Sequence, residues 1–138
     1  MSDDDTHTKA DDETAALVHD VARRMRRRPD AVFDLESPET VVPLLPVQEL
    51  LFAVQEIGVA DASDLLTLTT PAQVRSMLDL SLWRRDRVEP EEMVDWLSAL
   101  LELDEHDFRT KIWALDPELL GQILRRLVGG YDPELPPG

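Results

Sequence analysis

The sequence predicts an all-α protein, and three observations support this fold class. Apolar residues recur at spacings of three and four, as on one face of a helix, and do not alternate as in a half-buried strand. The apolar segments are rich in leucine rather than in β-branched residues. Proline precedes several of them, where its fixed φ and missing N–H suit a first helical turn. We therefore expect short, amphipathic, proline-initiated helices.

The chain is predicted to have three parts: a disordered acidic tail at 1–13, a helical domain at 14–130 and a C-terminal tail at 131–138. Residues 1–13 carry six acidic side chains against one lysine and lack a hydrophobic period. The last eight residues, YDPELPPG, contain too many prolines to continue a helix.

The first helix is expected to begin at Thr14 and to end before Pro29. Its apolar residues, at helical spacing, are Val18, Val21, Ala22 and Met25. The segment ends in RRMRRR, and acidic residues first with basic residues last suit the helix dipole. We interpret the arginine cluster as a solvated helix end. The alternative is a basic arm that docks on the acidic body of the protein or on an anionic partner.

Further helices are predicted where a capping residue or a proline precedes an apolar period. The expected starts are Ser37–Pro38, Pro46, Asp61, Thr70–Pro71, Pro90, Glu105 and Asp116–Pro117. The expected stops are Pro43, Gly58 and Gly129–Gly130. The stripes expected to face the core include Val47, Leu50, Leu51 and Val54; Val74, Met77 and Leu78; Met93, Trp96, Leu97, Leu100 and Leu101; Phe108, Ile112 and Leu115; and Leu120, Ile123, Leu124, Leu127 and Val128.

Four helix starts share an irregular repeat, with apolar residues three, six and seven positions after a proline. The prolines are Pro38, Pro71, Pro90 and Pro117, at intervals of 33, 19 and 27 residues. A true array keeps a fixed period, and any proline-initiated amphipathic helix has this pattern. The helices are expected to stack as a small right-handed superhelix or to pack as a compact bundle, and both alternatives stay open.

Composition argues against several functional classes. A formal net charge of −15 opposes binding to nucleic-acid phosphates. The absence of cysteine removes disulfides, thiol catalysis and cysteine-type zinc sites. The acidic N-terminus does not fit a signal peptide, and no apolar run is long enough to span a membrane. We expect a cytoplasmic protein that neither binds nucleic acid nor inserts into a membrane.

Sequence motifs of catalysis are also missing. The chain has no glycine-rich phosphate loop, nucleophile elbow or HExxH segment. His106 lies in a cluster of acidic residues whose oxygen atoms suit a hard cation. These residues are Glu102, Asp104, Glu105 and Asp107. A solvated helix junction is our preferred interpretation of the cluster. We expect no enzymatic activity, no catalytic residue, no cofactor and no metal site.

The segment SLWRRDRVEP, residues 81–90, is the candidate site for a partner. Residues 29–74 contain eight acidic residues and no Lys or Arg, so a tryptophan beside three arginines stands out. We interpret the segment as a corner between two helices, in which Trp83 fills the core and Asp86 and Arg87 form hydrogen bonds. The alternative is a partner-binding patch, because Trp and Arg are enriched in interface hot spots. Its residues would be Trp83, Arg84, Arg85 and Arg87.

The chain resembles the opening helical region of a bacterial family of unknown function over about residues 29–131. The matching motifs are Leu-Pro-x-Gln-Glu-Leu at 45–50, Glu-Ile-Gly at 56–58, Thr-Pro-x-Gln at 70–73, Leu-Asp-Leu-x-Leu-Trp-x-x-Asp-Arg at 78–87 and LDPELL at 115–120. More distantly, the helix pattern is similar to the N-terminal helical domain of MgtE-type magnesium transporters, a superhelix whose acidic surface helps to sense Mg²⁺. Both resemblances imply a helical fold, and neither implies a catalytic chemistry.

We therefore expect a non-enzymatic helical interaction or regulatory module whose partner is a protein. One alternative is a regulatory domain that responds to divalent cations and binds Mg²⁺ or Ca²⁺ weakly, because acidic helices that face one another attract such ions. A second alternative is a fragment of a larger enzyme.

Overall fold

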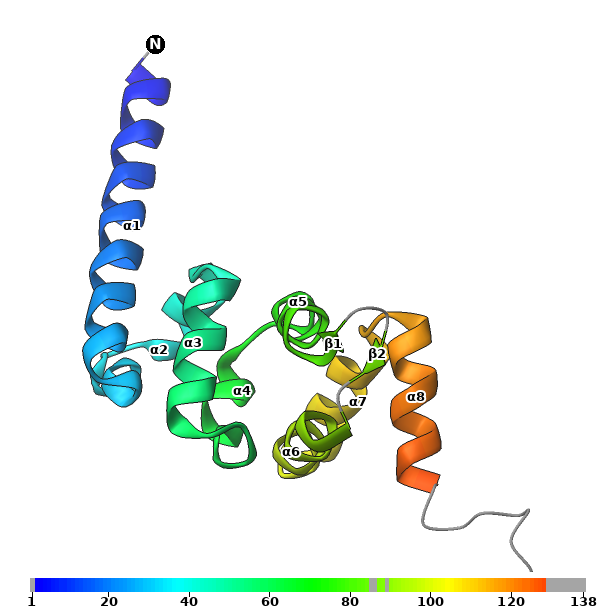
Figure 1. The fold of residues 1–138 in the computed structure, drawn as a ribbon. Helices are drawn as coiled ribbons and strands as arrows, with labels where there is room; N and C mark the ends of the chain where they lie inside the picture. The colour runs from blue at the N-terminus through cyan, green and yellow to red at the C-terminus, as the bar shows by residue number, and fades with distance from the viewer. Residues whose placement is uncertain (1, 85–86, 89, 129–138) are drawn as a thin grey trace, which may run out of the picture.

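The computed structural model describes the backbone of residues 2–84, 87–88 and 90–128, and the side chains of residues 11–82 and 90–125. The all-α fold class is confirmed, since almost all described residues are helical (Figure 1). The α-helices are α1 (Ser2–Arg27), α2 (Pro38–Val41), α3 (Val47–Ile57), α4 (Ser63–Leu68), α5 (Pro71–Leu82), α6 (Pro90–Leu101), α7 (Glu105–Trp113) and α8 (Pro117–Val128). Three 3-10 helices lie between them: η1 (Pro29–Asp34), η2 (Val42–Leu44) and η3 (Val59–Asp61).

The corner between α5 and α6 contains a feature that the sequence does not predict. The strands β1 (Trp83–Arg84) and β2 (Arg87–Val88) form a short antiparallel pair, in which Trp83 lies opposite Val88. Aromatic and β-branched residues favour extended backbone, which explains this pairing between two helices. Each strand has only two residues, so the fold class is unchanged.

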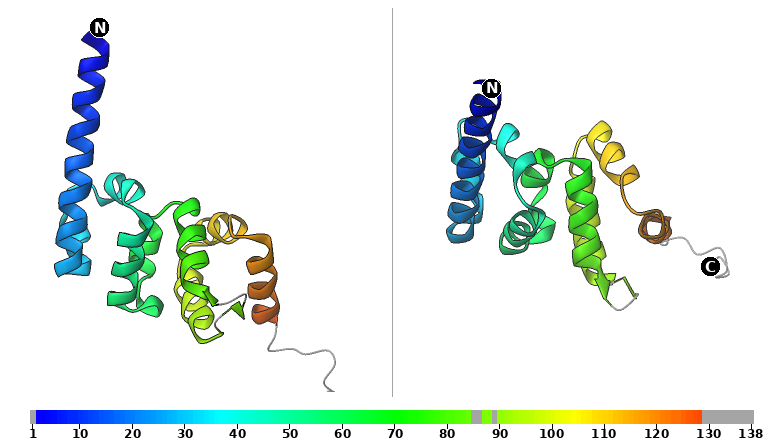
Figure 2. Two further views of the ribbon diagram at one scale, coloured as in Figure 1. Left: turned by 45° about the horizontal axis from the view of Figure 1, so that its top comes forward. Right: turned by 90° about the horizontal axis from the view of Figure 1, so that it is seen from above.

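Helix α1 begins earlier than the sequence predicts. Residues 2–13, expected to be disordered, form the first turns of a continuous helix of 26 residues. These residues include no glycine or proline, and their acidic side chains suit the positive end of the helix dipole. Among the described side chains, those of α1 that are buried against the protein body are Val21, Ala22 and Met25, all in its second half. The first half extends away from the other helices (Figures 1 and 2).

The helices stack in a row from α1 to α8 (Figures 1 and 2). Along this row α1 contacts α3, α3 contacts α5, and α5 contacts α7, while α4 packs on α6. Contacts between each helix and the next but one are typical of stacked helix pairs. The order of the contacts therefore favours stacking, one of the two arrangements expected from the sequence.

Besides the start of α1, one other predicted helix start differs from the structure. Proline is the first residue of α2, α5, α6 and α8. The sequence predicts Asp61 as the cap of the next short helix, whereas Asp61 lies in η3 and α4 begins at Ser63. The cause is Gly58, whose φ of 102° ends α3 and leads directly into the 3-10 turn.

A continuous core runs through the row. The predicted face of α6 is confirmed for Met93, Trp96, Leu97 and Leu100, all buried, but Leu101 is 56% exposed. The same correction applies to Leu124 on α8, which is exposed, while Leu119 is buried in its place. The buried face of α6 is one residue narrower than predicted, and that of α8 is rotated toward Leu119. Successive residues of a helix are about 100° apart, so a shift of one position turns a side chain away from the core.

Within the described residues, no single helix is both long and apolar enough to cross a membrane. The segments Pro38–Leu44 and Val47–Ile57 meet those two criteria only when taken as a pair, and the pair is bent by 118°.

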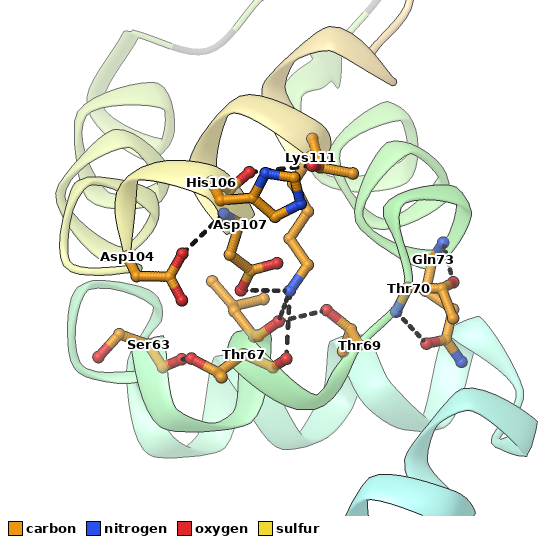
Figure 3. Close-up of polar contacts among 11 residues, drawn as sticks. Ser63, Thr67, Thr69, Thr70, Gln73, Asp104, His106, Asp107 and Lys111 are labelled. Carbon is orange, nitrogen blue, oxygen red and sulfur yellow. Dashed lines mark hydrogen bonds and ion pairs between the residues drawn. The ribbon is translucent and has the colours of Figure 1, made fainter.

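Gln73 links the start of α5 to an earlier corner of the chain. Its backbone N–H donates to the Thr70 hydroxyl at 3.0 Å, and its side-chain oxygen accepts from the Thr70 N–H at 2.9 Å, forming a capping box. Its amide nitrogen donates to the carbonyls of Val42, at 2.9 Å, and Leu45, at 3.1 Å. Gln73 is buried, so these bonds hold η2 and the start of α3 against α5 (Figure 3 shows Thr70 and Gln73).

Replacing Gln73 with leucine is expected to lower the free energy of unfolding by about 1–3 kcal/mol, because buried carbonyls lose hydrogen bonds that water cannot replace. Urea unfolding followed by circular dichroism measures this change. The control is Gln55→Leu on α3, where the side chain is exposed and the expected change is within about 0.5 kcal/mol. Equal losses in the two variants would contradict the role assigned to Gln73.

Candidate interaction groove

A groove of about 440 Å³ runs beside α1, on the side that faces η2 and the start of α3. Its α1 wall is formed by Asp11, Thr14, Ala15, Val18, His19, Ala22 and Arg26. Its other wall is formed by Leu44, Pro46 and Glu49. The middle of the groove is thus apolar, and charged side chains lie toward its two ends.

The α1 wall has the spacing of a helix–helix seam. Asp11, Ala15, Val18 and Ala22 follow one another at steps of four, three and four residues, as the core positions of a heptad do. Of these residues Ala15 is exposed and Val18 is partly buried, whereas Ala22 is buried in the protein core, so this wall is open to a partner mainly at residues 11–18. On the opposite wall Leu44 is 53% exposed. The shape and lining of the groove therefore fit a helix.

An ion pair between Arg26 and Glu49 closes one end of the groove. The Arg26 Nε donates to a Glu49 carboxylate oxygen at 2.9 Å, and Nη2 donates to the other oxygen. The hydrogen bond from Arg26 holds the pKa of Glu49 below its usual value, against the opposing effect of burial; the charges of Arg26 and His19 act in the same direction as the bond. Bidentate geometry fixes the angle between α1 and α3 at this point.

This ion pair bears on the arginine cluster predicted at the end of α1. Arg26 contacts Glu49, Arg28 contacts Asp30 and Asp34, and both Arg23 and Arg24 contact Asp20. Arg26 and Arg28 thus dock on the acidic body of the protein. This agrees in part with the alternative interpretation, in which the arginine cluster is a basic arm that docks on this body. The outer parts of the cluster remain exposed, as expected for a solvated helix end.

Lys111 on α7 is a buried charged residue that the sequence did not single out. It is 1% exposed, and its ammonium group donates to the carbonyls of Leu66, at 2.7 Å, and Thr67, at 3.2 Å (Figure 3). A third bond joins it to the Asp107 carboxylate at 2.9 Å. The two carbonyls lie in the last turn of α4, the negative end of that helix. All three donors of the ammonium are engaged, so Lys111 fixes α7 on α4.

Two sequence signals point to Lys111 and Gln73 in hindsight. Lys111 lies on α7 beside Ile112 and three residues after Phe108, so it shares the apolar side of that helix. Gln73 stands three residues after Thr70, the spacing of a capping box.

The acidic residues around His106 each contact a different partner. Asp104 accepts the Asp107 N–H at 2.8 Å and so caps α7, and Glu102 accepts the Ser63 hydroxyl at 2.7 Å. Asp107 pairs with Lys111, and Glu105 pairs with Arg109. Among the residues that the structure describes, no three or more metal-ligating side chains converge. The cluster contributes to a helix junction, and cation binding there stays the alternative interpretation.

Residues 7–129 match the sequence model of DUF6178, which is described as a family of unknown function. The chain belongs to the DUF6178 family. Neither a search of curated proteins nor a search of solved structures gave a match. The DUF6178 match agrees with the resemblance to a family of unknown function, and it starts within α1, so that it includes the groove.

In this DUF6178 chain, several motifs that carry the resemblance have structural roles. Thr-Pro-x-Gln forms the capping box of α5 and its link to η2. Glu-Ile-Gly ends α3 through the left-handed Gly58. In LDPELL, the Asp116 carboxylate accepts the backbone N–H groups of Glu118 and Leu119 at 3.1 and 3.2 Å and caps α8. These residues stabilise helix ends.

The structure describes only part of the predicted partner patch of the DUF6178 chain. Arg85 and Asp86 are among the residues that the structure does not describe, and the side chains of Trp83, Arg84 and Arg87 are not described either. The strand pair places the backbone of Arg84 opposite that of Arg87. Both interpretations of the segment, a corner and a partner-binding patch, stay predictions.

Proposed function

We propose that this DUF6178 domain is a non-enzymatic protein-interaction module whose binding surface is the groove between α1 and α3. One observation carries the proposal: the exposed Ala15 and the partly buried Val18 of α1 line a groove whose opposite wall presents Leu44 to solvent. Removing such apolar surface from water stabilises a complex. An amphipathic helix laid in an apolar groove is a recurrent form of protein recognition.

The ion pair at the end of the groove supports a binding role rather than a catalytic one. General acid–base catalysis requires a side chain that can exchange a proton with a bound substrate. Arg26 and Glu49 are instead hydrogen-bonded to each other, and the lowered pKa of Glu49 keeps it ionised for this pair. The pair joins α1 to α3 and so maintains the width of the groove.

Site-specific photocrosslinking in the native cell tests the proposal. A benzophenone amino acid is placed at Leu44, on the groove wall, and in a matched variant at Leu101 on α6, which is similarly exposed at 56% and lies outside the groove lining. We expect a discrete crosslinked protein product from position 44 and not from position 101. The absence of a product at position 44, or the same product at both positions, would show that the groove is not the binding surface.

A further inference from the structure

We infer that the groove holds a basic amphipathic helix of a partner protein, whose Lys and Arg residues lie toward Asp11 and Asp12. This inference rests on the proposed function of the groove and names the chemistry of its partner. Apolar contact stabilises such a complex, while complementary charge selects the partner and fixes its orientation.

The segments that form the groove are acidic. Residues 11–49, which include both walls, carry nine acidic side chains and five arginines. Residues 11–22 contain four of the acidic residues and no Lys or Arg, and residues 29–49 contain the other five and again no Lys or Arg. An excess of negative charge beside an apolar surface attracts a cationic partner and repels an anionic one.

The five arginines at the end of α1 do not offset the negative charge at the open part of the groove. They begin at residue 23, more than one helical turn beyond Val18. Four of them contact carboxylates of this same chain, on Asp20, Glu49, Asp30 and Asp34. The other end of the groove is lined by Asp11, and Asp12 is exposed beside it, so positive charge on a partner is favoured there.

The open part of the groove presents apolar side chains between its charged ends. Ala15 is exposed, Val18 is partly buried, and Leu44 across the groove is 53% exposed. A helix that covers these side chains needs an apolar stripe, and basic residues at one end of the stripe then lie beside Asp11. Nucleic acids and anionic lipid surfaces carry negative charge, so they do not fit this end of the groove.

Two designed helical peptides test the inference on the full chain. Both have the same leucine stripe, and the polar positions at one end are lysine in the first peptide and glutamate in the second. In fluorescence anisotropy we expect the lysine peptide to bind about tenfold more tightly or better, because like charges across an interface weaken binding. Raising NaCl from about 0.1 to about 0.5 M should reduce this preference, since salt screens exposed charges.

Two double variants locate the charge effect on the surface. Asp11→Lys with Asp12→Lys reverses the charge at the groove, whereas Glu91→Lys with Asp95→Lys makes the same change of net charge at exposed positions of α6, outside the groove lining. The first should weaken binding of the lysine peptide by about tenfold and the second by about twofold or less. Circular dichroism checks that both variants keep their helices. Equal losses in the two variants would show that the peptide responds only to overall charge, and would overturn the inference.

The photocrosslink from position 44 separates this inference from the proposed function. Mass spectrometry identifies the crosslinked segment, which should carry Lys or Arg next to apolar residues at helical spacing. A crosslinked segment that is acidic, or that belongs to a second copy of this chain, would overturn the basic partner and retain the groove as a binding surface. Binding of neither peptide, or equal binding of both, would also overturn the inference. The absence of a crosslink at position 44 would overturn the proposed function, and this inference with it.

Discussion

Replacing Trp96 with alanine is expected to lower the free energy of unfolding by about 3–5 kcal/mol. The indole is 0% exposed at the centre of α6, and its Nε1–H donates to the Ser81 hydroxyl of α5 at 3.1 Å. Ser81 in turn donates to the Glu92 carboxylate at 3.0 Å. The substitution leaves a large cavity between α5 and α6 and removes the donor to Ser81. Urea unfolding measured by circular dichroism gives the change.

Two further variants make the Trp96 result specific. Trp113 on α7 is 69% exposed, and Trp113→Ala should change stability by less than about 1 kcal/mol. Trp96→Phe keeps most of the ring and loses the hydrogen bond, so its cost should lie between those of the two alanine variants. If Trp96→Ala were as stable as Trp113→Ala, the packing of α6 described above would be wrong.

Removing the buried ammonium of Lys111 is expected to be the second large effect. In Lys111→Met the apolar stem is largely kept, but the Asp107 carboxylate and the last carbonyls of α4 lose their donor. Breaking one side of a buried ion pair costs about 3–5 kcal/mol, and because Asp107 remains partly exposed we expect about 2–4 kcal/mol here. Chemical unfolding at neutral pH measures the loss.

The control for Lys111 lies on the same helix with the same spacing. Arg109 and Glu105 also form a pair four residues apart, but both side chains are exposed. Arg109→Met should cost less than about 0.5 kcal/mol, since exposed pairs are screened by water. A double variant, Lys111→Met with Asp107→Ala, should recover part of the loss. Similar losses from Lys111→Met and Arg109→Met would show that the buried pair adds nothing beyond helix propensity.

The sequence predicted those parts of the fold that depend on local periodicity. Pro90 marks the start of α6, and the buried residues at 93, 96, 97 and 100 follow from that start and the helical repeat. The start of α1 was misplaced, because the charge density of residues 1–13 indicates disorder, whereas the packed half of α1 supports a helix that continues into them.

Features that join distant segments were not predicted. Lys111 is buried because α4, more than forty residues earlier in the chain, supplies two carbonyl acceptors. The groove is formed jointly by residues 11–26 of α1 and residues 44–49, and its existence depends on the angle between them. Periodicity identifies the faces of these helices but contains no information about how two faces are set against each other.

The stacking of each helix on the next but one affects how the chain acquires and loses its structure. Because most contacts between helices join elements that are near neighbours in chain order, the two ends of the row need not meet before packing energy is gained, and topologies rich in such contacts fold rapidly. Stability is then distributed as a chain of neighbouring interfaces, and unfolding can begin at an end of the row without disrupting its middle. The corner held by Gln73 and the junction held by Lys111 both lie in the interior of the row, so they are expected to exchange their amide hydrogens last.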